Sequence, residues 1–144
     1  MSATADHAEE RTNPAAKLGF EPGQVVQEIG YDDDAEQELR EAVRAVIGQD
    51  LVDEDYDDVP DVVLLWFRQD DGDLTDALVD ATGLVDEGAP IWLMTPKTGR
   101  DGHIEPSDIG EAAKTAGLAQ TKTINAGKDW SGSRLVTPKT AGRK

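Results

Sequence analysis

Side chains able to bind a charged ligand gather in one glycine-containing segment, Lys97-Thr98-Gly99-Arg100-Asp101-Gly102-His103. The segment follows residues 89–95, an apolar stretch with the composition of a buried strand. In open α/β sheets, ligands bind beyond the carboxyl ends of the strands. Lys97, Arg100 and His103 are therefore candidate ligand- or partner-binding residues. The alternative is an ordinary glycine turn with solvated charges.

A second candidate lies near the C-terminus, in Lys128-Asp129-Trp130-Ser131-Gly132-Ser133-Arg134, where the connection between two strands is expected. Tryptophan and arginine are enriched at the energetic centres of protein interfaces. A small domain also needs large aromatic side chains in its core. Lys128, Trp130 and Arg134 are therefore candidate binding residues, although for Trp130 itself we favour a position in the core.

No side chain stands in a pattern typical of catalysis or metal binding. Cysteine is absent, and the two histidines, His7 and His103, do not form a zinc-binding spacing. Ser131 lacks the G-x-S-x-G turn of hydrolases. The acidic stretch 53–58 lacks the glycine and the terminal glutamate that a calcium-binding loop requires. We therefore assign no catalytic residue and no metal site.

The spacing of apolar residues predicts strands that alternate with helices. Leu39, Val43 and Ile47 lie on one helical face, and residues 61–67 form an apolar run typical of a strand buried on both faces. We predict strands at 24–29, 61–67, 89–95, 119–126 and 133–137, and a short edge strand at Leu51-Val52. We predict a helix that follows the acidic triplet 32–34 and runs to about Ile47, a second from about Leu74 to Gly83, and a third from an N-cap at Ser107 to Gly117.

This order predicts one α/β domain, with a mostly parallel sheet and helices on both of its faces. The last two strands are joined by only about six residues, too few for a parallel crossover, so we expect a C-terminal antiparallel hairpin. A chain of 144 residues has room for a single core. We expect a disordered arm at 1–16, the domain at 17–139 and a basic tail at 140–144.

The charge of the chain is strongly negative and uneven. The net charge is −16, made up of −22 over residues 1–113 and +6 over residues 114–144. An acidic body repels nucleic acid and anionic membranes. Three interpretations of the basic end stay open. It could bind an acidic partner, it could pack against the acidic body of the same chain, or the charges could serve solubility alone.

Nothing in the sequence indicates a membrane protein or a secreted one. The longest apolar run, residues 62–67, is far shorter than the roughly 20 residues of a spanning helix. The N-terminal residues have neither the basic nor the apolar region of a signal peptide. We expect a cytoplasmic protein without a membrane partner.

Three stretches resemble the core of S-adenosylmethionine-dependent methyltransferases, which has a Rossmann-like sheet ending in an antiparallel hairpin. They are residues 18–26 (LGFEPGQVV), which are similar to the entry to that family's first strand, residues 60–65 (PDVVLL), similar to its central strand, and residues 84–93 (LVDEGAPIWL), similar to its helix-turn-strand. The sequence as a whole is most similar to a family of short uncharacterised bacterial proteins, from about Leu18 to Pro138, most visibly at residues 128–136. The resemblance implies a reduced Rossmann-like fold and no established activity.

The sequence departs from the methyltransferase pattern where the cofactor would bind. That family has a loop close to G-x-G-x-G after its first strand, whereas Gly30 is followed here by Tyr31 and the triplet 32–34. An acidic residue that ends the second strand holds the ribose in that family, and the resemblance carries this role to Asp53 or Glu54. Gly30, Asp53 and Glu54 are the cofactor-binding candidates.

Side chains in place of the loop glycines lead us to expect no cofactor. We therefore expect a non-catalytic regulatory or protein-interaction domain whose partner is another protein. The alternative is a small methyltransferase or nucleotide-binding enzyme with an atypical loop. A third possibility, nucleic-acid binding, depends on the basic segment 114–144.

Overall fold

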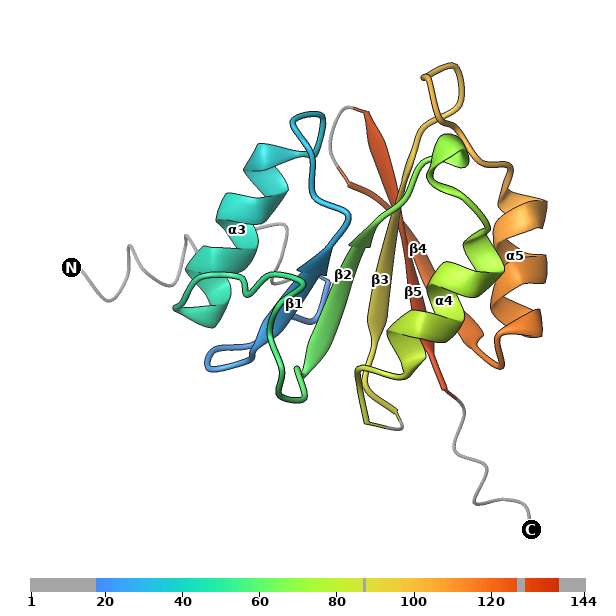
Figure 1. The fold of residues 1–144 in the computed structure, drawn as a ribbon. Coiled ribbons are helices and arrows are strands. Elements are labelled where there is room, and N and C mark those ends of the chain that lie inside the picture. The colour runs from blue at the N-terminus through green and yellow to red at the C-terminus, as the bar shows by residue number, and fades with distance from the viewer. Residues whose placement is uncertain (1–17, 87, 127–128, 138–144) are drawn as a thin grey trace, which may run out of the picture.

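A five-stranded sheet with helices on both sides forms the protein in the computed structural model, which describes residues 18–86, 88–126 and 129–137 (Figure 1). The strands are β1 (Val26–Ile29), β2 (Val62–Trp66), β3 (Ile91–Pro96), β4 (Ala119–Asn125) and β5 (Trp130–Val136). The helices are α3 (Gln37–Ile47), α4 (Leu74–Thr82) and α5 (Pro106–Thr115), with the short 3-10 turn η1 (Gln69–Asp71) before α4.

The strands follow the spatial order β1-β2-β3-β5-β4. β1 pairs with β2 and β2 with β3 in parallel, whereas β5 is antiparallel to both β3 and β4. The predicted fold class is confirmed: an α/β sheet with parallel N-terminal strands and a C-terminal antiparallel hairpin. The sequence predicted this hairpin but not that its second strand, β5, lies against β3.

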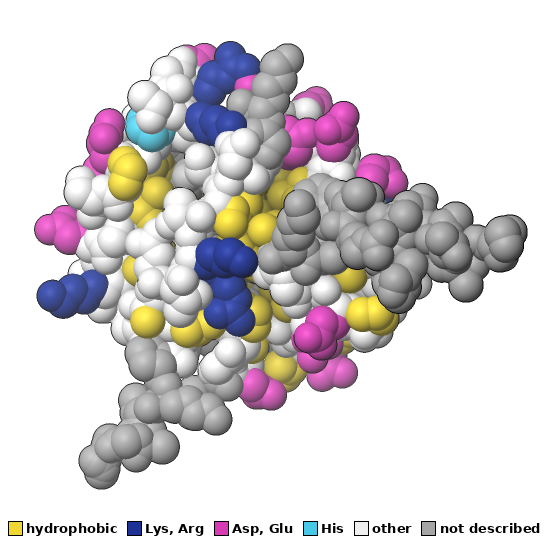
Figure 2. Space-filling model, turned by 180° about the vertical axis from the view of Figure 1, so that it is seen from behind, with side chains coloured by type: hydrophobic (Ala, Val, Ile, Leu, Met, Phe, Trp, Pro, Cys, Tyr) yellow, Lys and Arg dark blue, Asp and Glu magenta, His cyan; other side chains and the backbone are white. Residues whose placement is uncertain are grey.

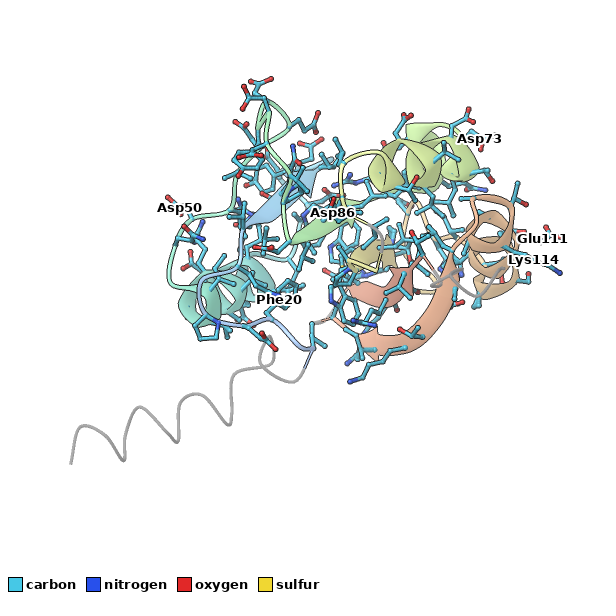
Figure 3. All side chains as sticks on the ribbon, turned by 90° about the horizontal axis from the view of Figure 1, so that it is seen from below. Phe20, Asp50, Asp73, Asp86, Glu111 and Lys114 are labelled. Atoms are coloured by element: carbon cyan, nitrogen blue, oxygen red, sulfur yellow. The ribbon has the colours of Figure 1, made fainter. Side chains whose placement is uncertain are left out.

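The helices divide between the two faces of the sheet, as predicted. Figure 3 shows α4 and α5 on one side, and α3 with Phe20 on the other. β2 contributes to both cores, because Val62 and Leu64 face α3 while Val63 and Leu65 face α4 and α5. Every residue of β2 and β3 is buried, so these central strands hold in place the loops at their ends.

One predicted helix start is wrong. The first helix follows the acidic triplet 32–34 and ends at Ile47, as predicted, and it begins at Gln37 after the turn in which the triplet lies. The third helix does not begin with Ser107 as its N-cap. Glu105 occupies the N-cap position and Pro106 the first helical position, where proline loses no hydrogen bond.

Two strand predictions also need correction. β5 begins at Trp130, so Trp130 lies inside a strand and not in the connection before it. The predicted edge strand Leu51-Val52 is reduced to a single parallel bridge between Val52 and Gln27. None of the helices in the described ranges has the length and apolar character needed to span a bilayer.

Candidate functional site

Gly30 directly follows β1, at the position where a cofactor loop would be expected. Its N–H donates to Oε2 of Glu54 at 2.8 Å, and its carbonyl oxygen accepts from Nη1 of Arg68 at 2.9 Å. Its φ is +78°, and a Cβ added here would lie 2.3 Å from the carbonyl oxygen of Trp66. Glycine is therefore required at position 30 for the backbone to lie this close to β2. Side chains of the same chain bind both the N–H and the carbonyl oxygen of Gly30.

Arg68 organises the carboxyl ends of β1 and β2. Its Nε lies 3.1 Å from Oδ2 of Asp34 and its Nη2 lies 2.5 Å from Oδ1 of the same carboxylate. Its Nη1 lies 3.2 Å from Oδ2 of Asp71. The guanidinium also lies over the ring of Trp130, with Cζ 5.2 Å from the centroid. Hydrogen bonding from Arg68 lowers the pKa of Asp34, and the same bond raises the pKa of Arg68.

Glu28 is a buried carboxylate on β1, on the face covered by α3. Nε of Arg40 lies 2.7 Å from Oε2 of Glu28, Nη2 lies 2.9 Å from Oε1, and Nε1 of Trp66 donates to Oε2 at 2.8 Å. The hydrogen bond to Glu28 raises the pKa of Arg40. Arg40 also lies over the ring of Tyr31, 4.1 Å from its centroid. Both oxygens of Glu28 are therefore satisfied, which is what a buried charge needs.

Two hollows of about 380 and 390 Å³ flank Tyr31 and Glu54 at this edge of the sheet. The structure brings the candidates Gly30 and Glu54 into contact. Asp53 lies beside them, but its carboxylate accepts from the N–H of Asp55 within its own loop at 3.0 Å. The carboxylates in these walls oppose an anionic ligand and suit hydroxyl groups or cations.

The loop 97–103 meets the start of β5. The N–H of Lys97 donates to the carbonyl oxygen of Asp129 at 2.9 Å, and the side chains of Arg100 and Asp129 form an ion pair. A hollow of about 400 Å³ lies here, lined in part by Arg100, Asp129 and Trp130. Two candidate segments that lie far apart in the sequence therefore form one surface.

Trp130 lies in the core, which is the position that the sequence favoured. It is 2% exposed, and its Nε1 donates to the carbonyl oxygen of Asp34 at 2.9 Å. Its ring packs edge-to-face against Trp66, with centroids 4.9 Å apart. Trp66 and Trp92, which belong to the apolar runs 61–67 and 89–95 that were expected to form buried strands, are also buried.

The remaining candidates lie elsewhere. Nδ1 of His103 is 2.9 Å from the carbonyl oxygen of Pro96, so the ring turns back onto the end of β3. His103 lines a separate hollow of about 500 Å³ with the side chains of Glu105 and α5. Arg134 lies further along β5, where it pairs with Trp92 of β3. Lys128 lies outside the described residues.

Arg68 is the site residue that sequence analysis missed. It is the first charged residue after the longest apolar run, at the carboxyl end of the predicted central strand. That position, together with the acidic triplet after β1, was a usable signal for an ion pair between strand ends. Within the described ranges, no group of three or more His, Asp or Glu side chains is arranged to hold a metal ion.

Comparison with known proteins identifies the family of the chain. Residues 15–139 match the model of the DUF3052 proteins, described as of unknown function. The uncharacterized protein Rv2239c of Mycobacterium tuberculosis and the uncharacterized protein Mb2263c of Mycobacterium bovis are each 51% identical over 140 residues, covering 97% of this chain and 86% of the relative.

Solved structures resemble the chain in fold. A SAM-dependent methyltransferase from Aquifex aeolicus aligns with a TM-score of 0.55 and 12% identity, over 90% of this chain and 89% of that one. The mitomycin 7-O-methyltransferase MmcR aligns with a TM-score of 0.60 and 13% identity, over 90% of this chain but only 53% of its own length. Identities this low establish the fold and not the activity. The chain belongs to the DUF3052 family of proteins of unknown function, and it has a methyltransferase-like Rossmann fold.

Proposed function

We propose that this protein is a non-catalytic protein-interaction domain, in which a methyltransferase-like fold serves as a scaffold without a working cofactor loop. One observation carries the proposal: the N–H and the carbonyl oxygen of Gly30 are bound by Glu54 and Arg68 of the same chain. The backbone that a nucleotide-like ligand would approach is therefore already in use.

The surrounding side chains oppose S-adenosylmethionine at this position. Tyr31 and the triplet 32–34 replace the glycines that the resemblance leads one to expect. The cation that could bind the carboxylate of such a ligand is Arg68, whose side chain is only 14% exposed and whose guanidinium is already shared between the carboxylates of Asp34 and Asp71. Displacing such an ion pair exposes charges that each need a new partner. The residues present therefore do not fit the cofactor.

The surface formed by Arg100, Asp129 and the loop 97–103 supports the interaction half of the proposal. The side chain of Arg100 is 51% exposed although it is ion-paired, so it stays accessible to a second partner. The loop is held by the bond from Lys97 to the backbone of Asp129. A loop fixed in this way loses little conformational entropy on binding.

The test is a titration of isotope-labelled protein with S-adenosylhomocysteine, followed through backbone amide shifts. We expect no saturable shift at Gly30, Tyr31 or Glu54 with millimolar ligand. The indole N–H signals of Trp66 and Trp130 are further reporters, because they donate to Glu28 and to the carbonyl oxygen of Asp34 in this network. Saturable shifts at these amides would overturn the non-catalytic proposal.

The second candidate function is a small methyltransferase or nucleotide-binding enzyme. The two hollows on either side of Tyr31 and Glu54 favour it, because they lie at the carboxyl end of β1, where this fold binds ligands. The same titration decides between the two candidates. Binding confined to the residues around these hollows would direct the search to a methyl acceptor.

A further inference from the structure

Two Asp-Gly dipeptides occur in the chain, Asp71-Gly72 and Asp101-Gly102. The backbone can rearrange at such a dipeptide, because glycine has no side chain to keep the preceding carboxyl group away from its own backbone nitrogen. Both dipeptides lie in loops at the carboxyl ends of strands, the first after β2 and the second after β3. Their surroundings differ, and this difference determines which of them we expect to react.

The carboxylate of Asp71 is held away from the nitrogen of Gly72. Its Oδ2 accepts from the backbone N–H of Arg68 at 2.9 Å and from Nη1 of the same residue at 3.2 Å. Both donors belong to a residue three positions earlier in the chain, so the side chain of Asp71 is directed back along η1. An attack by the nitrogen of Gly72 would first have to break both hydrogen bonds.

The carboxylate of Asp101 has no such restraint. Asp101 is exposed, and among the residues that the structure describes its side chain has no hydrogen bond or ion pair. The neighbouring Arg100 pairs with Asp129 instead. The N–H of Gly102 likewise has no acceptor within the described part of the chain. The carboxyl group and the nitrogen that would react are therefore both free of other bonds.

Asp101 and Gly102 are the two central residues of a turn at the surface. The N–H of His103 donates to the carbonyl oxygen of Arg100 at 3.1 Å, which closes the turn, and Gly102 has a φ of +85° that suits the second central position of a type II turn. The loop projects beyond the end of the sheet in Figure 1, and Figure 2 shows Lys, Arg and His side chains open to solvent at this end of the molecule. Water, which the rearrangement requires, therefore reaches the turn.

Packing against Arg68 explains the glycine at position 102. A Cβ added to Gly102 would lie 2.9 Å from Cβ of Arg68. The carbonyl oxygen of Gly102 accepts from the N–H of Gln69 at 2.9 Å, so the turn is joined to the loop after β2. The close approach of two loops thus places a glycine directly after an unrestrained aspartate.

We propose that Asp101-Gly102 is a site of spontaneous modification, at which Asp101 becomes isoaspartate in the folded protein while Asp71 does not. The nitrogen of Gly102 attacks Cγ of Asp101, the N–Cγ bond forms, and the carboxyl OH leaves with the amide proton as water. Solvent water then adds to the main-chain carbonyl carbon of Asp101, and the bond between that carbon and the nitrogen of Gly102 breaks. The backbone now runs through Cγ, and the former main-chain carbonyl is a carboxylate.

The modification changes the shape of the loop, because it adds one methylene carbon to the backbone of a tight turn. The contact between Gly102 and Arg68 has no space for a displaced backbone. We expect the hydrogen bond from Gln69 to Gly102 to be lost. The surface that the loop 97–103 forms with Asp129 then changes as well, and this inference does not depend on the proposed function of that surface.

The test incubates the full, folded chain at mildly acidic pH, where the protonated carboxyl group reacts, and analyses its peptic peptides by chromatography and mass spectrometry. Isoaspartate has the mass of aspartate but elutes separately, and the cyclic intermediate is lighter by one water. We expect Asp101 to react at least about tenfold faster than Asp71, whose two bonds from Arg68 must break first. Asp101→Glu should remove the product, because its cyclic intermediate would need a larger ring.

The same chain in concentrated urea is the matched control. Unfolding removes the bonds from Arg68, so both dipeptides should then react at similar rates. Hydrogen exchange provides a second measurement, since exchange at the Gln69 amide of the folded chain should accelerate in step with the isoaspartate formed. Equal rates at the two dipeptides in the folded chain, or no product at Asp101 there, would overturn the proposal.

Discussion

Arg68 and Asp34 form a two-pronged ion pair that joins the carboxyl end of β2 to the turn after β1, with N–O distances of 3.1 and 2.5 Å. The two residues are 34 positions apart in the sequence. The pair lies where an open α/β sheet would present its loops to a ligand. In this protein those loops are bound to each other.

Removing the side chain of Arg68 should destabilise the protein, because the carboxylates of Asp34 and Asp71 and the carbonyl oxygens of Gly30 and Trp66 each lose a hydrogen bond from it. The guanidinium is 14% exposed and Asp34 is 57% exposed, so the contact is intermediate between a buried and a surface ion pair. We expect Arg68→Ala to lower the free energy of unfolding by about 2 kcal/mol. A double-mutant cycle with Asp34→Ala should give a coupling energy of about 1 kcal/mol in urea denaturation. Additive losses would show that the two side chains do not interact in solution.

The same pair predicts a pH dependence. Arg68 lowers the pKa of Asp34 in the folded protein, so the folded state favours the ionised carboxyl. That stabilisation is present above the unfolded pKa, about 3.9, and is lost as the pH falls through the lower folded value. Arg68 stays protonated over this range, because its pKa is raised.

Asp34→Asn should therefore lose less stability than the wild type when the pH falls from about 6 to about 3. The measurement is the free energy of unfolding in urea at both pH values. Asp50→Asn is the control, because the side chain of Asp50 is 85% exposed and its carboxylate comes no closer than 3.7 Å to Nε of Arg44. An identical loss in the wild type and in Asp34→Asn would contradict a lowered pKa.

The sequence predicted the strands better than the ends of the elements. The buried runs that became β2 and β3 were correct because burial on both faces leaves a continuous apolar signal. The triplet 32–34 suits a helix N-terminus locally, but it lies in the turn before α3, where Asp34 pairs with Arg68. A contact between distant segments overrode a local preference.

The candidate site was only partly predictable for the same reason. Gly30 and Glu54 were named separately, but nothing local to either indicates that one binds the other. Arg100 was named without Asp129, its partner across 29 positions. Residue types at loop positions can be read from the sequence, whereas their pairing depends on how the strands are ordered in the sheet.

Arg40 should matter far more to stability than Arg44, although both lie on α3. Arg40 pairs with Glu28, whose side chain is 6% exposed, whereas Arg44 pairs with the exposed Glu41. Arg40→Met leaves a buried carboxylate without its cation, so we expect a loss of about 3 kcal/mol. Arg44→Met should cost less than about 1 kcal/mol. Adding Glu28→Gln to Arg40→Met should recover part of the loss, and equal effects of the two arginine substitutions would contradict the buried pair.

Gly30→Ala tests whether the chain needs a close backbone approach at the end of β1. An alanine at φ +78° is strained by about 1–2 kcal/mol. Its Cβ would also lie 2.3 Å from the carbonyl oxygen of Trp66, in a strand that cannot easily move because its residues are buried. We expect a total loss of about 3 kcal/mol in the free energy of unfolding.

Gly99→Ala separates the two causes. Gly99 has a similar φ of +86°, but nothing lies within 4 Å of a Cβ added there. Only the backbone strain remains, so the expected loss is about 1 kcal/mol. The difference between the two variants measures the contact between Gly30 and β2. If both variants lose the same stability, β1 and β2 are further apart at this point than the structure has them, and Gly30 then has room for a ligand beside it.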